Sequence, residues 1–321
     1  MIKINLSSEV SLLDFHYTNL TSNVGRKENL LDKLDKARRT NKKMGPMFGY
    51  LKSNVLRDSK GFSIITARPE ELMQFAGDFE RTFGVLSDKI KDRLSRIFYY
   101  SDYDKWSAYE VAKRIGVNVC PYCNRSYTFI VGSDREKGTR FQFDHFLSQS
   151  KYPFLALSFY NLIPSCHICN SNLKGSEDFS TTSNIHPYIE GFDNELLFSI
   201  RPKNIKFLNG VPSSYRIKFR RGNNATWDID KVKAAFRNVV IFRLTKLYNM
   251  HKDYVDDLLV KSVIYNKAYI DSLFSQYGGT LFKNKDDVKR MVIGGYIEPR
   301  DYHKRVLSKL TADLAQELDL I

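Results

Sequence analysis

Residues 120–123 of the chain read CPYC, and residues 144–175 read DHFLSQSKYPFLALSFYNLIPSCHICNSNLKG. These two stretches hold all four cysteines of the chain, as two Cys-x-x-Cys pairs with no cysteine left over. Zinc accepts four thiolates in a tetrahedron, and a Cys-x-x-Cys turn can place two sulfurs on one ion. The alternative interpretation is two redox dithiols or four unrelated buried cysteines. We expect one structural Zn²⁺ held by Cys120, Cys123, Cys166 and Cys169.

The segments between and after the cysteine pairs predict two strands and a helix. Residues 126–131 are rich in β-branched and aromatic side chains, residues 132–134 favour a turn, and residues 139–144 alternate like a return strand. We therefore expect a β-hairpin that pairs the first segment with the last. Residues 170–174 suit the start of a short helix, with Asn170 near its N-cap.

Helical periodicity dominates the chain on both sides of this block. Apolar residues recur at helical spacing in residues 30–37, 75–97 and 230–321, whereas residues 215–220 alternate like a strand. The sequence thus predicts an α+β fold with three regions. These are a mostly helical basic region at 1–117, a zinc-stapled core at 118–190, and a region of short strands followed by helices at 191–321.

The charge balance favours a polyanionic partner. The 321 residues include 50 Lys and Arg against 36 Asp and Glu, which gives a net charge of +14. Such an excess is typical of nucleic-acid-binding proteins, although binding to anionic lipid or simple solubility also fits it. Residues 118–190 hold as many basic as acidic residues, so the excess lies in the flanking regions.

A basic stretch at residues 38–60 is the first candidate for a contact with phosphates. The alternative is an ordinary solvated face. The candidate residues within it are Arg38, Arg39, Lys42 and Lys43.

The sequence gives no sign of a membrane protein. Its longest apolar run is too short to cross a bilayer, and the N-terminal residues lack the apolar segment of a signal peptide. We expect a cytoplasmic protein with no membrane partner.

Four polar residues precede or directly follow the second cysteine pair. Asp144 and His145 are adjacent, Asn161 lies shortly before the pair, and Asn170 directly follows its last cysteine. Together with the cysteines, they make residues 118–176 resemble an HNH endonuclease of the ββα-metal type, in the variant that is stapled by a four-cysteine zinc site. The resemblance implies a central HNH module flanked by mostly helical N- and C-terminal regions.

The resemblance also assigns a role to each of these residues. Hydrolysis of a phosphodiester needs an activated water and a Lewis acid on the phosphate. By resemblance, His145 is the general base and Asp144 is a ligand of a catalytic Mg²⁺ or Mn²⁺. Asn170, which stands where many members have a histidine, would be a second ligand. Asn161 would hold the loop that bears the base through side-chain hydrogen bonds.

Three further residues are candidates for contacts with nucleic acid. Lys174 follows the last cysteine by five residues, one more than is usual in the family, so the helix register is open and Asn172 is a rival to Asn170 as metal ligand. Arg125 is either a phosphate contact or a surface residue. His186 is either a phosphate contact, an auxiliary ligand or part of a structural turn.

The expected function is that of a metal-dependent HNH endonuclease that cleaves DNA. The helical flanks loosely resemble longer bacterial HNH proteins such as the Septu-type nuclease subunits. These act in phage defence beside an ATPase, so the resemblance implies antiviral defence and an ATPase partner protein. The alternatives are an RNA or tRNA nuclease, and a zinc-stapled nucleic-acid-binding or scaffold protein without catalysis.

Overall fold

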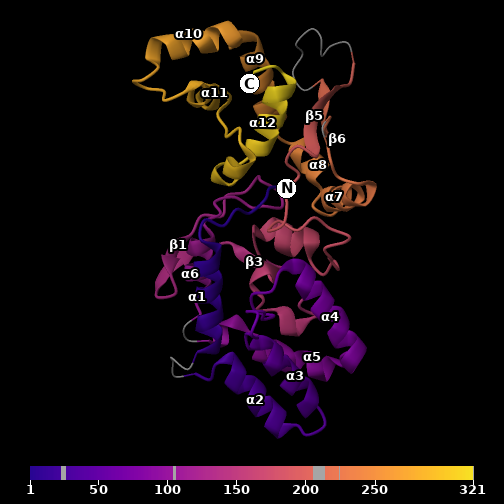
Figure 1. Cartoon of the computed structure of the whole chain (residues 1–321). Helices are drawn as coiled ribbons and strands as arrows, with labels where there is room; N and C mark the ends of the chain where they lie inside the picture. The colour runs from indigo at the N-terminus through magenta and orange to yellow at the C-terminus, as the bar shows by residue number, and fades with distance from the viewer. Residues whose placement is uncertain (23–26, 104–105, 205–213, 224, 321) are drawn as a thin grey trace. The chain divides into compact units, whose positions relative to one another are not determined.

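The computed structural model describes residues 1–22, 27–103, 106–204, 214–223 and 225–320, and the chain forms two compact units (Figure 1). The first unit comprises Met1–Ile4, Asn118–Tyr127 and Glu190–Ile321, and the second comprises Asn5–Val117 and Thr128–Ile189. Within the described residues, helices are combined with three two-stranded sheets, which confirms the α+β class.

The second unit is built mainly of helices. They are α1 (Glu9–Thr21), α2 (Leu30–Thr40), α3 (Gly45–Val55), α4 (Pro69–Phe83), α5 (Asp88–Ile97) and α6 (Ala108–Ile115), with a 3₁₀ turn η1 (Tyr100–Asp102) before α6. The helix predicted at 30–37 is α2, and the side chain of Asn29 caps it by accepting from the backbone N–H of Asp32. The single helical run predicted at 75–97 is wrong, because Gly84 ends α4 with a φ of 72° that favours glycine.

The N-terminal helices share a core with the segment that carries Leu157. His16 of α1 is fully buried, and its Nε2 donates to the carbonyl oxygen of Leu157 at 2.8 Å while Nδ1 accepts from Trp106 Nε1 at 2.9 Å. Burial lowers the pKa of His16 to about 4, so its ring stays neutral. Because of this shared core, the compact units differ from the three consecutive regions expected from the sequence.

Two short antiparallel sheets complete the second unit. β1 (Val131–Ser133) pairs with β2 (Glu136–Thr139), and β3 (Gln142–His145) pairs with β4 (Leu162–Ser165). Between β3 and β4 lie the 3₁₀ turns η2 (Pro153–Leu155) and η3 (Phe159–Asn161), and after β4 comes the wide helical turn η4 (Ile168–Lys174).

The hairpin predicted between residues 126–131 and 139–144 is therefore wrong in its pairing. Its segments meet only where Val131 pairs with Thr139, whereas residues 142–145 pair with residues 162–165. Strand propensity depends on packing against neighbours, so it could locate the strands without identifying their partners. The predicted order of strand, strand and helix is found instead in β3, β4 and η4.

The first unit contains the third sheet and the C-terminal helices. The sheet pairs β5 (Leu196–Pro202) with β6 (Tyr215–Arg221), which confirms the strand predicted at 215–220. One face carries aromatic rings, with Phe198 4.3 Å from both Phe219 and Tyr248 between ring centroids. The helices are α7 (Ile229–Ile241), α8 (Leu244–Tyr248), α9 (Lys252–Ile264), α10 (Lys267–Tyr277), α11 (Lys285–Ile293), η6 (Pro299–Lys304) and α12 (Ser308–Glu317).

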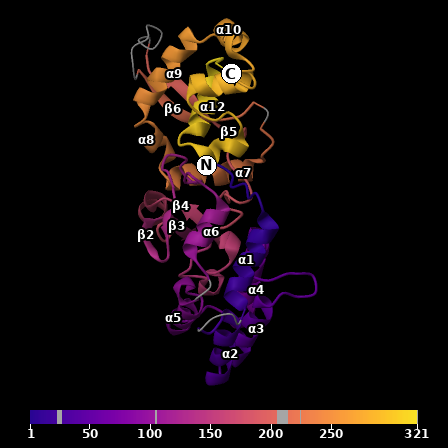
Figure 2. The same ribbon diagram turned by 90° about the vertical axis from the view of Figure 1, so that its left-hand side faces the viewer.

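Helix α12 holds the edge of this sheet (Figure 2). Asp313 accepts from the backbone N–H of Phe198 at 2.8 Å and also from Lys309 Nζ, and the side chains of both charged residues are buried. No helix in the described ranges is long and apolar enough to cross a membrane.

Candidate active site and metal centre

The four cysteines come together as one cluster. The sulfur atoms of Cys120, Cys123, Cys166 and Cys169 all lie within 4.8 Å of one another. Three of the cysteines are buried and Cys166 is half-buried. Four thiolates on one zinc ion lie about 2.3 Å from the metal, so their mutual distances also stay below the limit that the cluster keeps. The four residues are positioned to hold a metal ion, as the spacing predicts.

Each Cys-x-x-Cys pair is closed by the same backbone hydrogen bond. The N–H of Asn124 donates to the carbonyl oxygen of Cys120 at 2.7 Å, and the N–H of Asn170 donates to that of Cys166 at 3.0 Å. Asn124 has a φ of 49°, a left-handed conformation that asparagine tolerates better than most residues. The two turns therefore present their cysteines in the way that a shared ion requires.

His145 lies at the end of β3, opposite Leu162 of β4. Its Nε2 donates to the carbonyl oxygen of Ala156 at 3.1 Å. This bond selects the tautomer in which Nδ1 carries a lone pair and can accept a proton. Burial lowers the pKa of His145 below its usual value, and the nearby Asp144 carboxylate opposes this effect. The imidazole is therefore neutral at neutral pH, the form that a general base requires.

Asn161 ties together the two ends of the loop between β3 and β4. Its Oδ1 accepts from the backbone N–H of Leu147 at 2.6 Å, and its Nδ2 donates to the carbonyl oxygens of Leu147 and Leu155 at 3.2 and 3.0 Å. The side chain is buried. Because Leu155 precedes Ala156, the residue that holds the imidazole of His145, Asn161 also sets the position of that acceptor. This geometry agrees with the positioning role that the resemblance implies.

Asp144 is paired with Lys174 in the interior. Lys174 Nζ lies 3.0 Å from Asp144 Oδ1 and donates to the carbonyl oxygen of His145 at 2.7 Å, and the side chains of Lys174 and Asp144 are only 2% and 3% exposed. The expectation that Lys174 contacts nucleic acid is therefore wrong for this structure. The ammonium group of Lys174 lies inward, against the end of β3.

Replacing Lys174 with methionine is expected to lower the free energy of unfolding by about 3–5 kcal/mol, because removing one partner of a buried pair leaves the other charge in the interior. Lys151→Met is the control. Its exposed pair with Asp178 has a similar distance of 3.0 Å, and exposed pairs contribute only about 0–1 kcal/mol. Urea unfolding of both variants measures the difference, and equal losses would show that Lys174 does not stabilise Asp144 in this way.

Gln142 is a site residue that the sequence analysis missed. It lies two residues before Asp144 and so shares its face of β3, while Phe141 and Phe143 are buried on the other face. Gln142 Oε1 accepts from Asn170 Nδ2 at 2.9 Å. The alternation of apolar and polar residues in 141–144 is the signal that could have identified it. Gln142 thus bonds to Asn170, and Asp144 bonds to Lys174. Both partners belong to η4, so Asn170 lies at the face of β3 that carries Asp144.

Three other candidates lie elsewhere. His186 is buried, with its ring 4.2 Å from that of Phe146, and burial lowers its pKa to about 3. Its expected contact with phosphate is therefore wrong for this structure, because the ring is part of the core. Arg125 belongs to the first unit and donates from Nε to His251 Nε2 at 2.9 Å. Asn172 is exposed on η4.

The basic stretch that begins at Arg38 lies on the α2–α3 hairpin, away from β3 in the second unit (Figure 1, Figure 2). Arg38 and Arg39 both pair with Asp35, which also binds Lys52, so one carboxylate balances one of these three positive charges. Lys42 and Lys43 are exposed in the turn between the helices. Binding of phosphates by this stretch stays a prediction.

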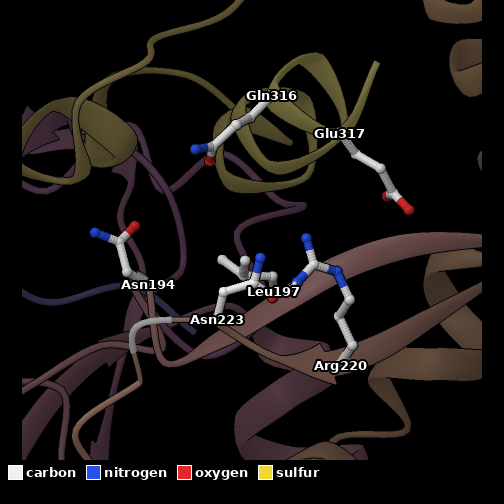
Figure 3. Close-up of a pocket in the computed structure, with 6 residues that line it drawn as sticks. All are labelled: Asn194, Leu197, Arg220, Asn223, Gln316 and Glu317. Carbon is white, nitrogen blue, oxygen red and sulfur yellow. Dashed lines mark hydrogen bonds between the residues drawn. The ribbon is translucent and has the colours of Figure 1, made fainter. Parts of the chain in front are cut away.

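A hollow of about 320 Å³ lies in the first unit, between β5–β6 and α12 (Figure 3). Figure 3 shows the guanidinium of Arg220 rising from the strand toward the helix that carries Gln316 and Glu317. The hollow is lined by Asn194, Leu197, Arg220, Asn223, Gln316 and Glu317. None of these is a histidine, cysteine or hydroxyl residue, so the hollow is a candidate for binding rather than for nucleophilic or histidine-based chemistry.

Comparison with known proteins finds a partial similarity. The chain is 27% identical over 134 residues to Protein ea31 of Escherichia phage lambda. The aligned part covers 41% of this chain and 40% of that protein, so the chain spans about two fifths of the length of its curated relative. No protein family model and no solved structure matches the chain.

Proposed function

We propose that the chain is a metal-dependent endonuclease of the HNH type that hydrolyses phosphodiester bonds in DNA. The observation that carries the proposal is the arrangement at the end of β3. There a neutral imidazole is fixed through Nε2, and it stands beside a buried carboxylate in a strand–strand–helix unit.

Each residue of the site has its own role in the proposed reaction. His145 Nδ1 takes a proton from the attacking water, while the carbonyl oxygen of Ala156 holds the ring and stabilises its protonated form. Asn161 keeps this carbonyl and the loop in place. Lys174 holds the end of β3 through the carbonyl oxygen of His145.

A divalent cation fits the donor types of this site. Carboxylate and amide oxygens are the ligands that Mg²⁺ and Mn²⁺ prefer, and Asp144 and Asn170 supply one of each. Asn170 donates from Nδ2 to Gln142, which orients its amide. When bound, the cation would supply Lewis acidity to the phosphate and to the leaving oxygen. With so few protein ligands, its affinity would depend on the phosphate oxygens of the substrate.

The substrate class is tested by incubating the purified protein with plasmid DNA and with RNA, each with Mg²⁺, Mn²⁺ or no divalent cation. We expect cleavage of the plasmid that requires the cation. Cleavage of RNA alone would replace DNA by RNA as the substrate. Binding of nucleic acid without cleavage of either would favour the non-catalytic zinc-stapled protein.

Replacing Asn170 with alanine is expected to slow cleavage and to raise the Mn²⁺ concentration needed for half-maximal activity, with partial rescue at high Mn²⁺. The reason is that the change weakens metal affinity and leaves the base in place. Asn172→Ala is the matched control, because Asn172 lies on the same helical turn and is exposed. A metal titration of both variants decides between them, and a larger effect of Asn172→Ala would transfer the ligand role to Asn172.

A further inference from the structure

One face of the β5–β6 ribbon is lined with positive charge. The register pairs Arg201 with Arg216, Ser199 with Lys218, and Leu197 with Arg220. Because side chains alternate between the two faces of a strand, these six residues share one face. The other face holds the buried rings that pack in the core of the first unit. The cations therefore occupy the face of the ribbon that is left outside this core.

No acidic residue of the two strands balances this face. Arg201 and Arg216 lie directly opposite each other, and like charges in such a pair are destabilising. In the parts of the ribbon that the structure describes, Arg201, Arg216 and Lys218 form no ion pair with an acidic side chain. Arg201 and Arg216 are exposed, and Lys218 is half-buried.

The surroundings extend the positive face at one end. Lys203 continues the ladder beyond β5 by donating its backbone N–H to the carbonyl oxygen of Ser214. Burial and the neighbouring charge of Lys203 lower the pKa of Lys252 below its usual value, and Asp256 opposes them. Asp256 and Asp253 are acids near this end, and Asp256 accepts from the hydroxyl of Tyr215.

The hollow described above lies at the other end of the same face. Arg220 and Leu197 line it, and the carboxamides of Asn194, Asn223 and Gln316 offer neutral hydrogen-bonding groups (Figure 3). Glu317 is the acid here, and its carboxylate already accepts from Ser199 Oγ and from the N–H of Ile200.

We propose that the face formed by Arg201, Arg216, Lys218 and Arg220 binds the sugar–phosphate backbone of a nucleic acid. A repeating polyanion complements a row of cations at alternate residues, and its binding would offset the repulsion between them. The surface would hold the substrate of the proposed nuclease and in that respect rests on the proposed function. Binding itself is measurable whether or not the chain cleaves.

The test is the double variant Arg216→Glu/Lys218→Glu, made in a His145→Ala background so that binding is measured without cleavage. The control is Lys233→Glu/Arg237→Glu on α7, which changes the net charge equally on an exposed helix of the same unit. The readout is the affinity for a DNA duplex over a series of salt concentrations. Thermal melting of both variants verifies that they fold.

We expect the ribbon variant to lose roughly tenfold or more in affinity and about two units of the salt slope, since each lost phosphate contact removes roughly one unit. The control should keep the slope of the parent. Equal losses in both variants, or none in either, would overturn the proposal. A variant that keeps its affinity for DNA but loses binding to phosphatidylserine vesicles would also overturn it, in favour of a lipid surface. A wild-type protein that cleaves DNA while the ribbon variant binds normally would refute this surface and leave the nuclease proposal intact.

Discussion

Replacing Cys166 with serine, or removing zinc with a chelator, is expected to unfold the chain around the cysteine cluster. Structural zinc contributes about 10–16 kcal/mol of apparent binding free energy in small zinc-binding peptides, whereas a whole domain is stable by only about 5–15 kcal/mol. The sheets of the second unit are short, with only three or four residues in each strand, so they offer few backbone bonds to replace the ion. We therefore expect a broad loss of structure and not only slower catalysis.

Zinc content and thermal unfolding measure this effect together. The wild type should contain one zinc ion per chain, and Cys166→Ser should lose both the ion and a cooperative part of the melting transition. His167→Ala is the matched control, because His167 lies inside the same Cys-x-x-Cys pair but is exposed and is not needed beside four thiolates. A wild-type protein without zinc, or a pair of disulfides at these positions, would contradict the account.

The parts of the site that could be predicted are those set by local chemistry. The spacing of the four cysteines was sufficient to predict that they meet, because the geometry of a Cys-x-x-Cys turn depends on only a few residues. The position of His145 at the end of a strand followed from the alternation of residues 139–144. The start of α2 followed in the same way from helical periodicity.

Strand pairing could not be predicted, because it is a tertiary property. A loop of sixteen residues, 146–161, separates β3 from β4. The local sequence of residues 139–144 does not indicate which strand pairs with them. The loop is closed by the buried side chain of Asn161, whose hydrogen bonds connect positions that only the fold brings together.

The burial of polar residues is the second feature that could not be predicted from the sequence. Lysine usually faces solvent and histidine is intermediate in burial, so a contact with phosphate was the expectation for both Lys174 and His186. In the fold, Lys174 is satisfied by Asp144 and the backbone, and His186 packs against Phe146. The sequence gives the number of charged residues, whereas the tertiary structure determines which groups pair with a buried charge.

His145→Ala is expected to have the largest effect on activity. A general base contributes typically about 10²–10⁴-fold to a rate, so cleavage should fall by at least a hundredfold. Folding should persist, because within the described ranges the imidazole makes a single hydrogen bond, to Ala156, whereas the loop is held by three bonds from Asn161. Binding should also persist, since the positive charge lies mainly in residues outside 118–190.

The matched control is His303→Ala, which removes a half-buried histidine of η6 in the first unit. It tests whether any loss of activity is specific to the ring at the end of β3. Its cleavage rate, zinc content and affinity for DNA should all equal those of the wild type.

The measurement that tests the central claim most directly is the rate of plasmid cleavage by His145→Ala in the presence of Mg²⁺, relative to wild type at equal zinc content and equal affinity for DNA. The account predicts a rate at least about a hundred times lower with unchanged zinc and binding. A variant that cleaves as fast as wild type would show that His145 is not the base. The assignment of nuclease activity to this site would then be wrong.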